Sequence, residues 1–410
     1  MAGRSQSPSK IGLALASGGP EGAIYEIGAL RALDEALEGI DFTDLPIYVG
    51  VSAGAIVGAC LANGLTPSQL ARAVVTRLPH GNSIQTRTFF TPTVREYVRR
   101  GLMVPGLVLA ALWDYARHPE AILQSFSRLS GAIPVALFDN DPIRRYMQAI
   151  FSVEGRTDDF RQLKAQLTIV AADLDTAEAR CFGDPGSDHI PISVAVQASA
   201  ALPGMYAPVL VDGHHYVDGM LLKTLHASVA LERDADLVIC VNPIVPVTNG
   251  PAAHAPAPGG SLVDQGLPMV LSQALRTIIH SRMRVGMGNY AHKYPDRDVV
   301  LFEPGPADSR MFVTYIFSFS ARKSICEQAY RATRADLLER YDELSTIFNR
   351  HGIRLCREVL EDSTRDLWAG LEGGPAHPGP ATRTLDQALT RLETLIDEIA
   401  AGSGEPSTPS

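Results

Sequence analysis

The chain of 410 residues has little of what membrane-spanning, secreted or metal-binding proteins need. No segment reaches about 18 consecutive apolar residues, so we expect no membrane-spanning helix. Residues 1–10 are mostly polar and lack the apolar core of a signal peptide. The five cysteines are odd in number, scattered, and lack the spacing of metal ligands. We therefore expect a protein of the reducing cytoplasm, with no disulfide framework and no metal or other cofactor.

Basic residues are also scarce, with 36 Lys and Arg against 45 Asp and Glu and a net charge of −9. Nucleic-acid-binding proteins use an excess of basic residues to attract phosphates, so a nucleic-acid partner is not expected. The length allows a sizeable core, either as one large α/β domain with extensions or as two domains.

The pentapeptide 50–54 reads Gly-Val-Ser-Ala-Gly and lies between a strand-like run, 45–49, and a helix-like run, 53–61. A serine in this G-x-S-x-G context sits on a sharp turn that exposes its hydroxyl, and larger flanking residues would collide with neighbouring elements. The start of the following helix adds partial positive charge. Ser52 is therefore a candidate nucleophile, although 35 glycines allow the motif to arise by chance.

A second candidate feature is the glycine-rich segment 17–22, which follows the short apolar strand predicted at 11–16. Pro20 suits the first turn of a helix, and the N–H groups before it have no intrahelical partner. They can bind a phosphate or the oxyanion of a tetrahedral intermediate. A dinucleotide-binding turn is the alternative, but Ser17 replaces the first glycine of G-x-G-x-x-G and a nucleophile motif comes next.

The third feature is the segment 209–219, which predicts two short strands joined by a turn at Asp212-Gly213. Asp218 then stands at a strand end before Gly219, although an Asp-Gly pair by itself is most often only a turn. None of the 11 histidines lies in a comparably defined position. A Ser-His-Asp triad therefore stays an alternative without an obvious histidine.

Together these three motifs resemble the patatin-like phospholipase family, which has a glycine-rich oxyanion loop, a G-x-S-x-G nucleophile and a later Asp-Gly. The resemblance covers most of residues 10–340, including 198–204 before the Asp-Gly, the strand-like run 300–304, Met311 and the run 318–321. It implies an α/β fold, a three-layer sandwich in which helices flank a mostly parallel central sheet. An inserted helical lid and C-terminal helices complete the expected architecture.

The resemblance also implies a serine-aspartate dyad, with Ser52 as nucleophile and Asp218 as general base. It assigns the oxyanion hole to the backbone N–H groups of Gly18 and Gly19. The supporting motif positions are Ser17, Gly22, Gly50, Gly54 and Gly219.

The activity so implied is hydrolysis of carboxylic ester bonds in lipids, as a phospholipase A, a lysophospholipase or a non-specific lipid esterase. Two alternatives remain: a Ser-His-Asp esterase acting on small esters, and a lipid-binding or regulatory protein without turnover.

Two residues depart from the family pattern. Glu21 stands where the family's loop usually has a basic residue, so we hypothesise that it disfavours phospholipid and favours neutral acyl esters. Met220 follows the Asp-Gly where glycine or alanine is usual, and it either lines an acyl pocket or packs as an ordinary core residue.

The predicted organisation is a hydrolase domain over 10–340 and a C-terminal helical extension over 341–401. Within the domain, 80–135 is expected to be a lid or a helix packed on the core, and 246–266 a flexible loop. Residues 1–9 and 402–410 are expected to be disordered tails.

Two predicted helices suggest partners. The basic amphipathic segment 267–287 can lie on anionic lipid, although a packed helix with a solvated face is the commoner case. Leucines and isoleucines recur at heptad spacing over 385–399, and they could join two subunits or dock on the body of the protein. We therefore expect a lipid ester substrate and peripheral contact with a membrane surface. If the last helix joins two subunits, the protein forms a homodimer.

Overall fold

The structure is a computed structural model that describes residues 9–75, 90–117, 134–246, 262–305 and 319–368. One compact unit ends at Leu367, and the second, Trp368–Ser410, is described only at Trp368. Outside the described residues lie the tails 1–8 and 402–410, most of the predicted loop 246–266, Met311, and the helix predicted at 385–399.

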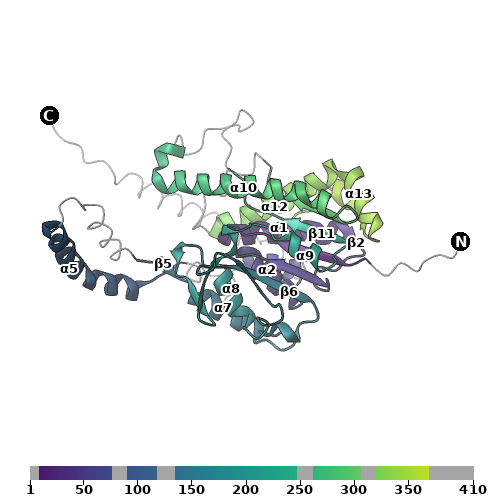
Figure 1. Cartoon of the computed structure of the whole chain (residues 1–410). Coiled ribbons are helices and arrows are strands. Elements are labelled where there is room, and N and C mark those ends of the chain that lie inside the picture. The colour runs from purple at the N-terminus through teal and green to yellow at the C-terminus, as the bar shows by residue number, and fades with distance from the viewer. Residues whose placement is uncertain (1–8, 76–89, 118–133, 247–261, 306–318, 369–410) are drawn as a thin grey trace, which may run out of the picture. The chain divides into compact units, whose positions relative to one another are not determined.

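The centre of the first unit is an eight-stranded sheet in the order β12-β11-β1-β3-β6-β10-β9, with β7 paired to β6 (Figure 1). Three strands join in antiparallel pairs: β7 (Ala179–Phe182), β9 (Val209–Val211) and β10 (His214–Asp218). The other five run parallel: β1 (Ile11–Leu15), β3 (Ile47–Gly50), β6 (Gln166–Asp173), β11 (Leu237–Val241) and β12 (Asp298–Phe302). The predicted α/β fold with a mostly parallel central sheet is confirmed.

Helices cover both faces of this sheet, which is why its strands are continuously apolar. On one face, Ala14, Val49 and Cys240 pack with α9 (Ala227–Glu232), and α10 (Leu267–Lys293) adds Met287 and Tyr290 to the same cluster. On the other face, Leu15 meets α2 (Ala53–Ala62). Helix α1 (Gly19–Ala36) lies against α2, α3 (Pro67–Val75) and α12 (Phe319–Glu339). The result is a three-layer sandwich.

The segment between α3 and β6 departs from this regular pattern. A small second sheet pairs β4 (Thr91–Pro92), β5 (Ala136–Asp139) and β8 (Gly204–Tyr206). Between β4 and β5 the structure describes α5 (Val94–Arg117), which leaves Leu102 78% and Trp113 61% exposed. Of these elements, β4 and α5 belong to the insertion predicted at 80–135, whereas β5 and β8 lie outside its bounds. Among the described residues, no helix has the combined length and apolarity that crossing a membrane requires.

Two predicted helices differ from the structure in extent. Helix α10 continues six residues past the predicted end at 287, to Lys293. The helical stretch predicted over 321–361 is interrupted, because Gly352 adopts a positive φ of 75° that ends a helix. The segments after α12 are α13 (Tyr341–Arg350), β13 (Arg354–Leu355), which pairs with β2 (Leu37–Glu38), and α14 (Arg357–Glu361). Two shorter helices support the site, α7 (Asp141–Phe151) and α8 (Ile192–Ser199).

Candidate active site

Ser52 lies on the turn between β3 and α2, where the backbone is strained. Its φ of 53° and ψ of −113° are unusual for a residue with a side chain, and the residue is only 5% exposed. Its N–H donates to the Ser199 hydroxyl oxygen at 2.8 Å, and that hydroxyl donates to the Val170 carbonyl oxygen at 2.6 Å. Ser199, at the end of α8, therefore holds the turn in place. Sequence reasoning named the stretch around Ser199 but not this role.

The glycines on either side of Ser52 are required by close backbone approaches. A Cβ at Gly54 would lie 2.4 Å from the carbonyl oxygen of Leu15, and a Cβ at Gly50 would lie 2.5 Å from the carbonyl oxygen of Gly54. Both contacts are with backbone atoms, which cannot move aside as a flexible side chain can. The approach of β1 to the turn that carries Ser52 thus requires a glycine at position 54, and the close packing of this turn on the start of α2 requires one at position 50.

Asp218 is the last residue of strand β10. The sheet brings it close to Ser52, because Ser52 follows β3 and the strands β3, β6 and β10 are neighbours in the sheet. The carboxyl group is 1% exposed, and one oxygen accepts the Met220 N–H at 2.9 Å. Burial raises the pKa of Asp218 from its usual 3.8 to about 7, opposed by hydrogen bonds from the Ser52 hydroxyl and the Met220 N–H. The structure thus brings the two predicted dyad residues into direct contact. Gly219 follows as the first residue of a short 3-10 turn.

The glycine-rich segment links the end of β1 to the start of α1. Gly19 has a φ of 63°, which glycine adopts without strain, and Gly22 donates its N–H to the Gly18 carbonyl oxygen at 3.0 Å. Within the described ranges, the N–H groups of Gly18 and Gly19 donate to no backbone carbonyl. Ser17 ties this loop to the Asp218 loop, since its hydroxyl donates to the Met220 sulfur at 3.4 Å.

Glu21 has charged neighbours that its sequence position did not reveal. Burial raises the pKa of the Glu21 carboxyl, while its own backbone N–H and the charges of Arg276 and Arg322 lower it. The two arginines come from α10 and α12, more than 250 residues away in the chain. The hypothesis that Glu21 disfavours phospholipid therefore left out two cations. No local signal could have predicted them.

Sequence reasoning also missed His226, which caps α9 close to the Asp218 loop. The ring is 4% exposed, and its Nε2 has no hydrogen-bond partner within the part of the chain that is described. Burial, reinforced by the charge of Lys223, lowers the pKa of His226 to about 4, so the ring is neutral. His226 is not among the groups that shift the pKa of Asp218. The residues around His226, Leu-Lys-Thr-Leu-His-Ala-Ser over 222–228, form no motif that indicates this placement.

Three exposed histidines pair with other carboxylates near the same sheet edge. His214 lies 2.9 Å from Asp173, His189 3.1 Å from Asp212, and His215 3.6 Å from Asp175. Ligand atoms of Asp173, Asp175 and His214 lie within 4.8 Å of one another. Hydrogen bonds account for this cluster, because Asp173 also accepts the N–H groups of Asp175 and Thr176.

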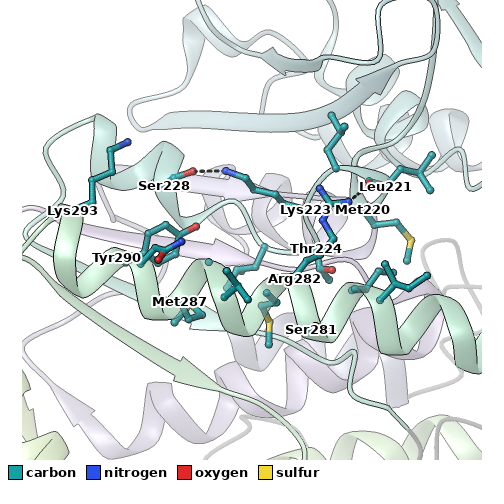
Figure 2. A pocket seen from close by; sticks show the side chains of 18 of the residues that line it. Met220, Leu221, Lys223, Thr224, Ser228, Ser281, Arg282, Met287, Tyr290 and Lys293 are labelled. Atoms are coloured by element: carbon teal, nitrogen blue, oxygen red, sulfur yellow. Dashed lines mark hydrogen bonds between the residues drawn. The ribbon is translucent and has the colours of Figure 1, made fainter.

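Two cavities border the loops that carry the dyad. The first, about 510 Å³ in volume, follows α10 and is called the α10 groove. Figure 2 shows Met220 and Leu221 at one end of it and Lys293 at the other, with Lys223 donating to Ser228 at 3.4 Å. Met220 also packs with Ile244 and Ile279, so it is both a core residue and a lining residue.

The second cavity, about 150 Å³, is called the helix pocket and lies between α1, α2, α3 and α7. It includes Pro20, which directly follows Gly19, and Ile56, whose N–H donates to the Ser52 carbonyl oxygen at 3.3 Å.

Several known proteins are similar to this chain. Uncharacterized NTE family proteins of Mycobacterium tuberculosis and Mycobacterium bovis are each 28% identical over 240 residues, which are 58% of this chain. The same stretch is 50% of each relative, so the chain spans about half the length of the curated relatives it matches.

Two solved structures share low similarity with the chain. VipD from Legionella pneumophila is 14% identical with a TM-score of 0.33, covering 98% of this chain and 89% of its own. The type III effector ExoU of Pseudomonas aeruginosa is 15% identical with a TM-score of 0.34, covering 99% of this chain and 67% of its own. The Patatin-like phospholipase family model, however, matches residues 13–231, more than half of the chain. The chain belongs to the patatin-like phospholipase family.

Proposed function

We propose that this protein is a serine acyl hydrolase that cleaves carboxylic ester bonds of lipids. The observation that carries the proposal is the hydrogen bond between the Ser52 hydroxyl and the buried Asp218 carboxyl group. A carboxylate is a weak base for a serine hydroxyl in water. Burial raises the pKa of Asp218 to about 7, which is where a general base is effective at neutral pH.

The reaction has two acyl-transfer steps. The Ser52 oxygen forms a bond to the ester carbonyl carbon while its proton passes to Asp218, and the intermediate collapses as the carbon–oxygen bond to the alcohol breaks. The leaving alcohol takes the proton from Asp218. Water then attacks the acyl-enzyme, gives its proton to Asp218, and releases the fatty acid as the proton returns to Ser52.

Charge that develops on the carbonyl oxygen needs donors close to Ser52. We assign this role to the N–H groups of Gly18 and Gly19, which precede the first full turn of α1 and donate to no backbone carbonyl among the residues described. The N-terminal end of a helix adds favourable partial charge. Each such donor contributes roughly 3 kcal/mol to transition-state stabilisation.

The two alternatives have less support. A Ser-His-Asp triad needs a histidine between Ser52 and an acidic group, whereas the Ser52 hydroxyl bonds directly to Asp218. A lipid-binding protein without turnover would gain nothing from a strained serine or from an aspartate with a raised pKa.

We also propose that the protein works at a lipid surface on the cytoplasmic side. Helix α5 exposes Leu102 and Trp113 together with Arg99, and α10 exposes Leu267 and Leu271. Apolar side chains next to basic ones suit the interface of an anionic membrane. Cosedimentation with phosphatidylglycerol vesicles tests this contact, and equal recovery from neutral and anionic vesicles would argue against the role of the arginine.

The test of the hydrolase is a lipid ester panel assayed with the parent and with Ser52→Ala. We expect the variant to lose turnover and to lose covalent labelling by an acyl-phosphonate probe, while keeping the circular dichroism spectrum of the parent. The matched control is Ser152→Ala, which removes an exposed hydroxyl at the end of α7 and should leave both readouts unchanged. Ester hydrolysis by Ser52→Ala at the parent rate would refute the proposal.

A further inference from the structure

We propose that the helix pocket holds the acyl chain of the ester that Ser52 attacks. The inference rests on the proposed function and adds to it the place where the substrate binds. The pocket then binds one apolar chain of limited length.

The first argument is position. Helix α2 begins directly after Ser52, and helix α1 begins at Gly19 in the glycine-rich loop. One helical turn further on, both helices line the helix pocket, through Ile56 and Ala23. A helical turn rises about 5.4 Å, so the pocket starts about that distance from the reacting groups. A chain attached to the carbonyl carbon would have to extend by about one helical turn to reach the pocket.

The second argument is chemistry. Ile24, Ile27, Val57 and Val74 line the pocket and are buried. Burial raises the pKa of the Cys60 thiol to about 12, so this residue is a neutral lining group and not a nucleophile. Apolar cavities stay dry and bind apolar occupants. An acyl chain gains more from this pocket than water or a polar head group does.

The third argument is the placement of charge at the two ends. Arg322 lines the pocket and acts on Glu21, which follows Pro20, so one cation lies near the dyad end. Arg156 donates to the Ile150 carbonyl oxygen at 3.1 Å and acts on Cys60, so a second cation lies at the far end. The apolar wall of α1 between them runs from Pro20 to Ile27, about 10 Å at the rise of a helix. The pocket is therefore apolar along its length and polar at its limits.

The α10 groove is the rival location. It is larger, but Lys223, Arg282 and Lys293 line it. At its dyad end the Met220 side chain is buried against Ile244 and Ile279, which separates the groove from Ser52 by a packed cluster. An extended acyl chain therefore fits the helix pocket better.

The experiment measures kcat/KM for p-nitrophenyl esters from acetate to palmitate in the full chain. Ile27→Trp fills the helix pocket, and we expect the ratio of kcat/KM for octanoate to that for acetate to fall about tenfold or more, because each methylene in an apolar pocket contributes roughly 10-fold or more. Ile27→Ala enlarges the pocket and should move the best substrate toward longer chains. The matched control Met283→Trp fills the α10 groove and should leave the ratio unchanged.

The outcomes separate the pocket from the activity. Unchanged chain-length profiles in both Ile27 variants would overturn the inference, as would a lower ratio in Met283→Trp alone. If Ile27→Trp does not fold, the Ile27→Ala profile decides by itself. Retained turnover in Ser52→Ala would instead remove the proposed function, whatever the profiles show.

Discussion

The helix pocket and the α10 groove border different parts of the proposed site, and they differ in size and lining. The groove has more than three times the volume and is lined by three cations, while the pocket is lined mostly by aliphatic side chains, with one cation at each end. Of these two cavities, the pocket is the one lined by the first turns of α1 and α2, which begin at Gly19 and directly after Ser52. Under the proposed function, proximity to Ser52 and an apolar lining favour the smaller cavity as the place where a substrate chain binds.

The largest expected effect tests whether one base serves every substrate. Asp218→Asn removes the proton acceptor and should lower kcat/KM by about 10²- to 10⁴-fold for short and long esters alike. In the parent, kcat/KM should fall about tenfold per pH unit below pH 7, because the pKa of Asp218 is raised to about 7 and only the carboxylate accepts a proton. Stopped-flow or steady-state pH profiles on acetate and octanoate check both statements. A large loss for octanoate only would mean that short esters use another base.

The next effect concerns how the raised pKa of Asp218 makes the free energy of unfolding depend on pH. The folded state holds the Asp218 proton more tightly than the unfolded chain does, since the pKa rises from 3.8 to about 7. The resulting stabilisation is complete below pH 3.8 and is lost as the pH rises through about 7. Between pH 5 and pH 8 the free energy of unfolding should therefore fall by about 3 kcal/mol more in the parent than in Asp218→Asn. Urea unfolding at both pH values measures the difference, and parallel curves for the two proteins would contradict it.

A smaller effect concerns helix α2, which carries Ser52 and forms one wall of the helix pocket. Gly54→Ala places a Cβ 2.4 Å from the Leu15 carbonyl oxygen and should destabilise the fold by roughly 1–3 kcal/mol. The matched control is Gly58→Ala, whose Cβ would meet only the end of the Leu15 side chain at 3.7 Å and should be tolerated. Thermal unfolding and ester turnover are measured for both. Equal behaviour of the two variants would show that the close approach of β1 is not needed.

The smallest expected effect lies at the charged end of the helix pocket. Glu21→Gln removes a carboxylate that acts on both Arg276 and Arg322, so the loop is left with more positive charge near it. We expect a gain of about two- to fivefold in kcat/KM for anionic phospholipid over a neutral monoacyl ester, as a charge near a half-buried site contributes roughly 0.5–1 kcal/mol. Arg276→Ala should shift the preference the opposite way. A shift in the same direction for both variants would contradict the electrostatic explanation.

Much of the fold was predictable because its signals are local. The apolar runs that became β1, β6 and β11 are buried on both faces, and such strands read as continuous hydrophobic stretches. The glycine turn before α1 and the G-x-S-x-G turn are recognisable because only small residues permit those backbone positions. Less was predictable beyond α12, where Gly352 adopts a positive φ within a stretch that otherwise favours helix.

The residues of the candidate site were also predictable only in part. Ser52, Asp218 and the glycine loop were identified because each has a short motif with a chemical purpose. Ser199 and Arg276 were not, because each acts on a residue that is distant in the chain, and His226 was not, because its burial depends on how the whole chain packs. A resemblance between motifs predicts which residues meet, but not what surrounds them.

The sequence by itself determined the α/β class, the turn that carries Ser52 and the glycine loop, because backbone sterics and hydrophobic burial act within a few residues. Only the tertiary structure decided that Asp218 is buried against the Ser52 hydroxyl with its pKa raised to about 7. It alone also decided that two arginines face Glu21 and that α1 and α2 enclose an apolar pocket. Desolvation and charge–charge interactions depend on distance in space, which the order of residues along the chain does not specify.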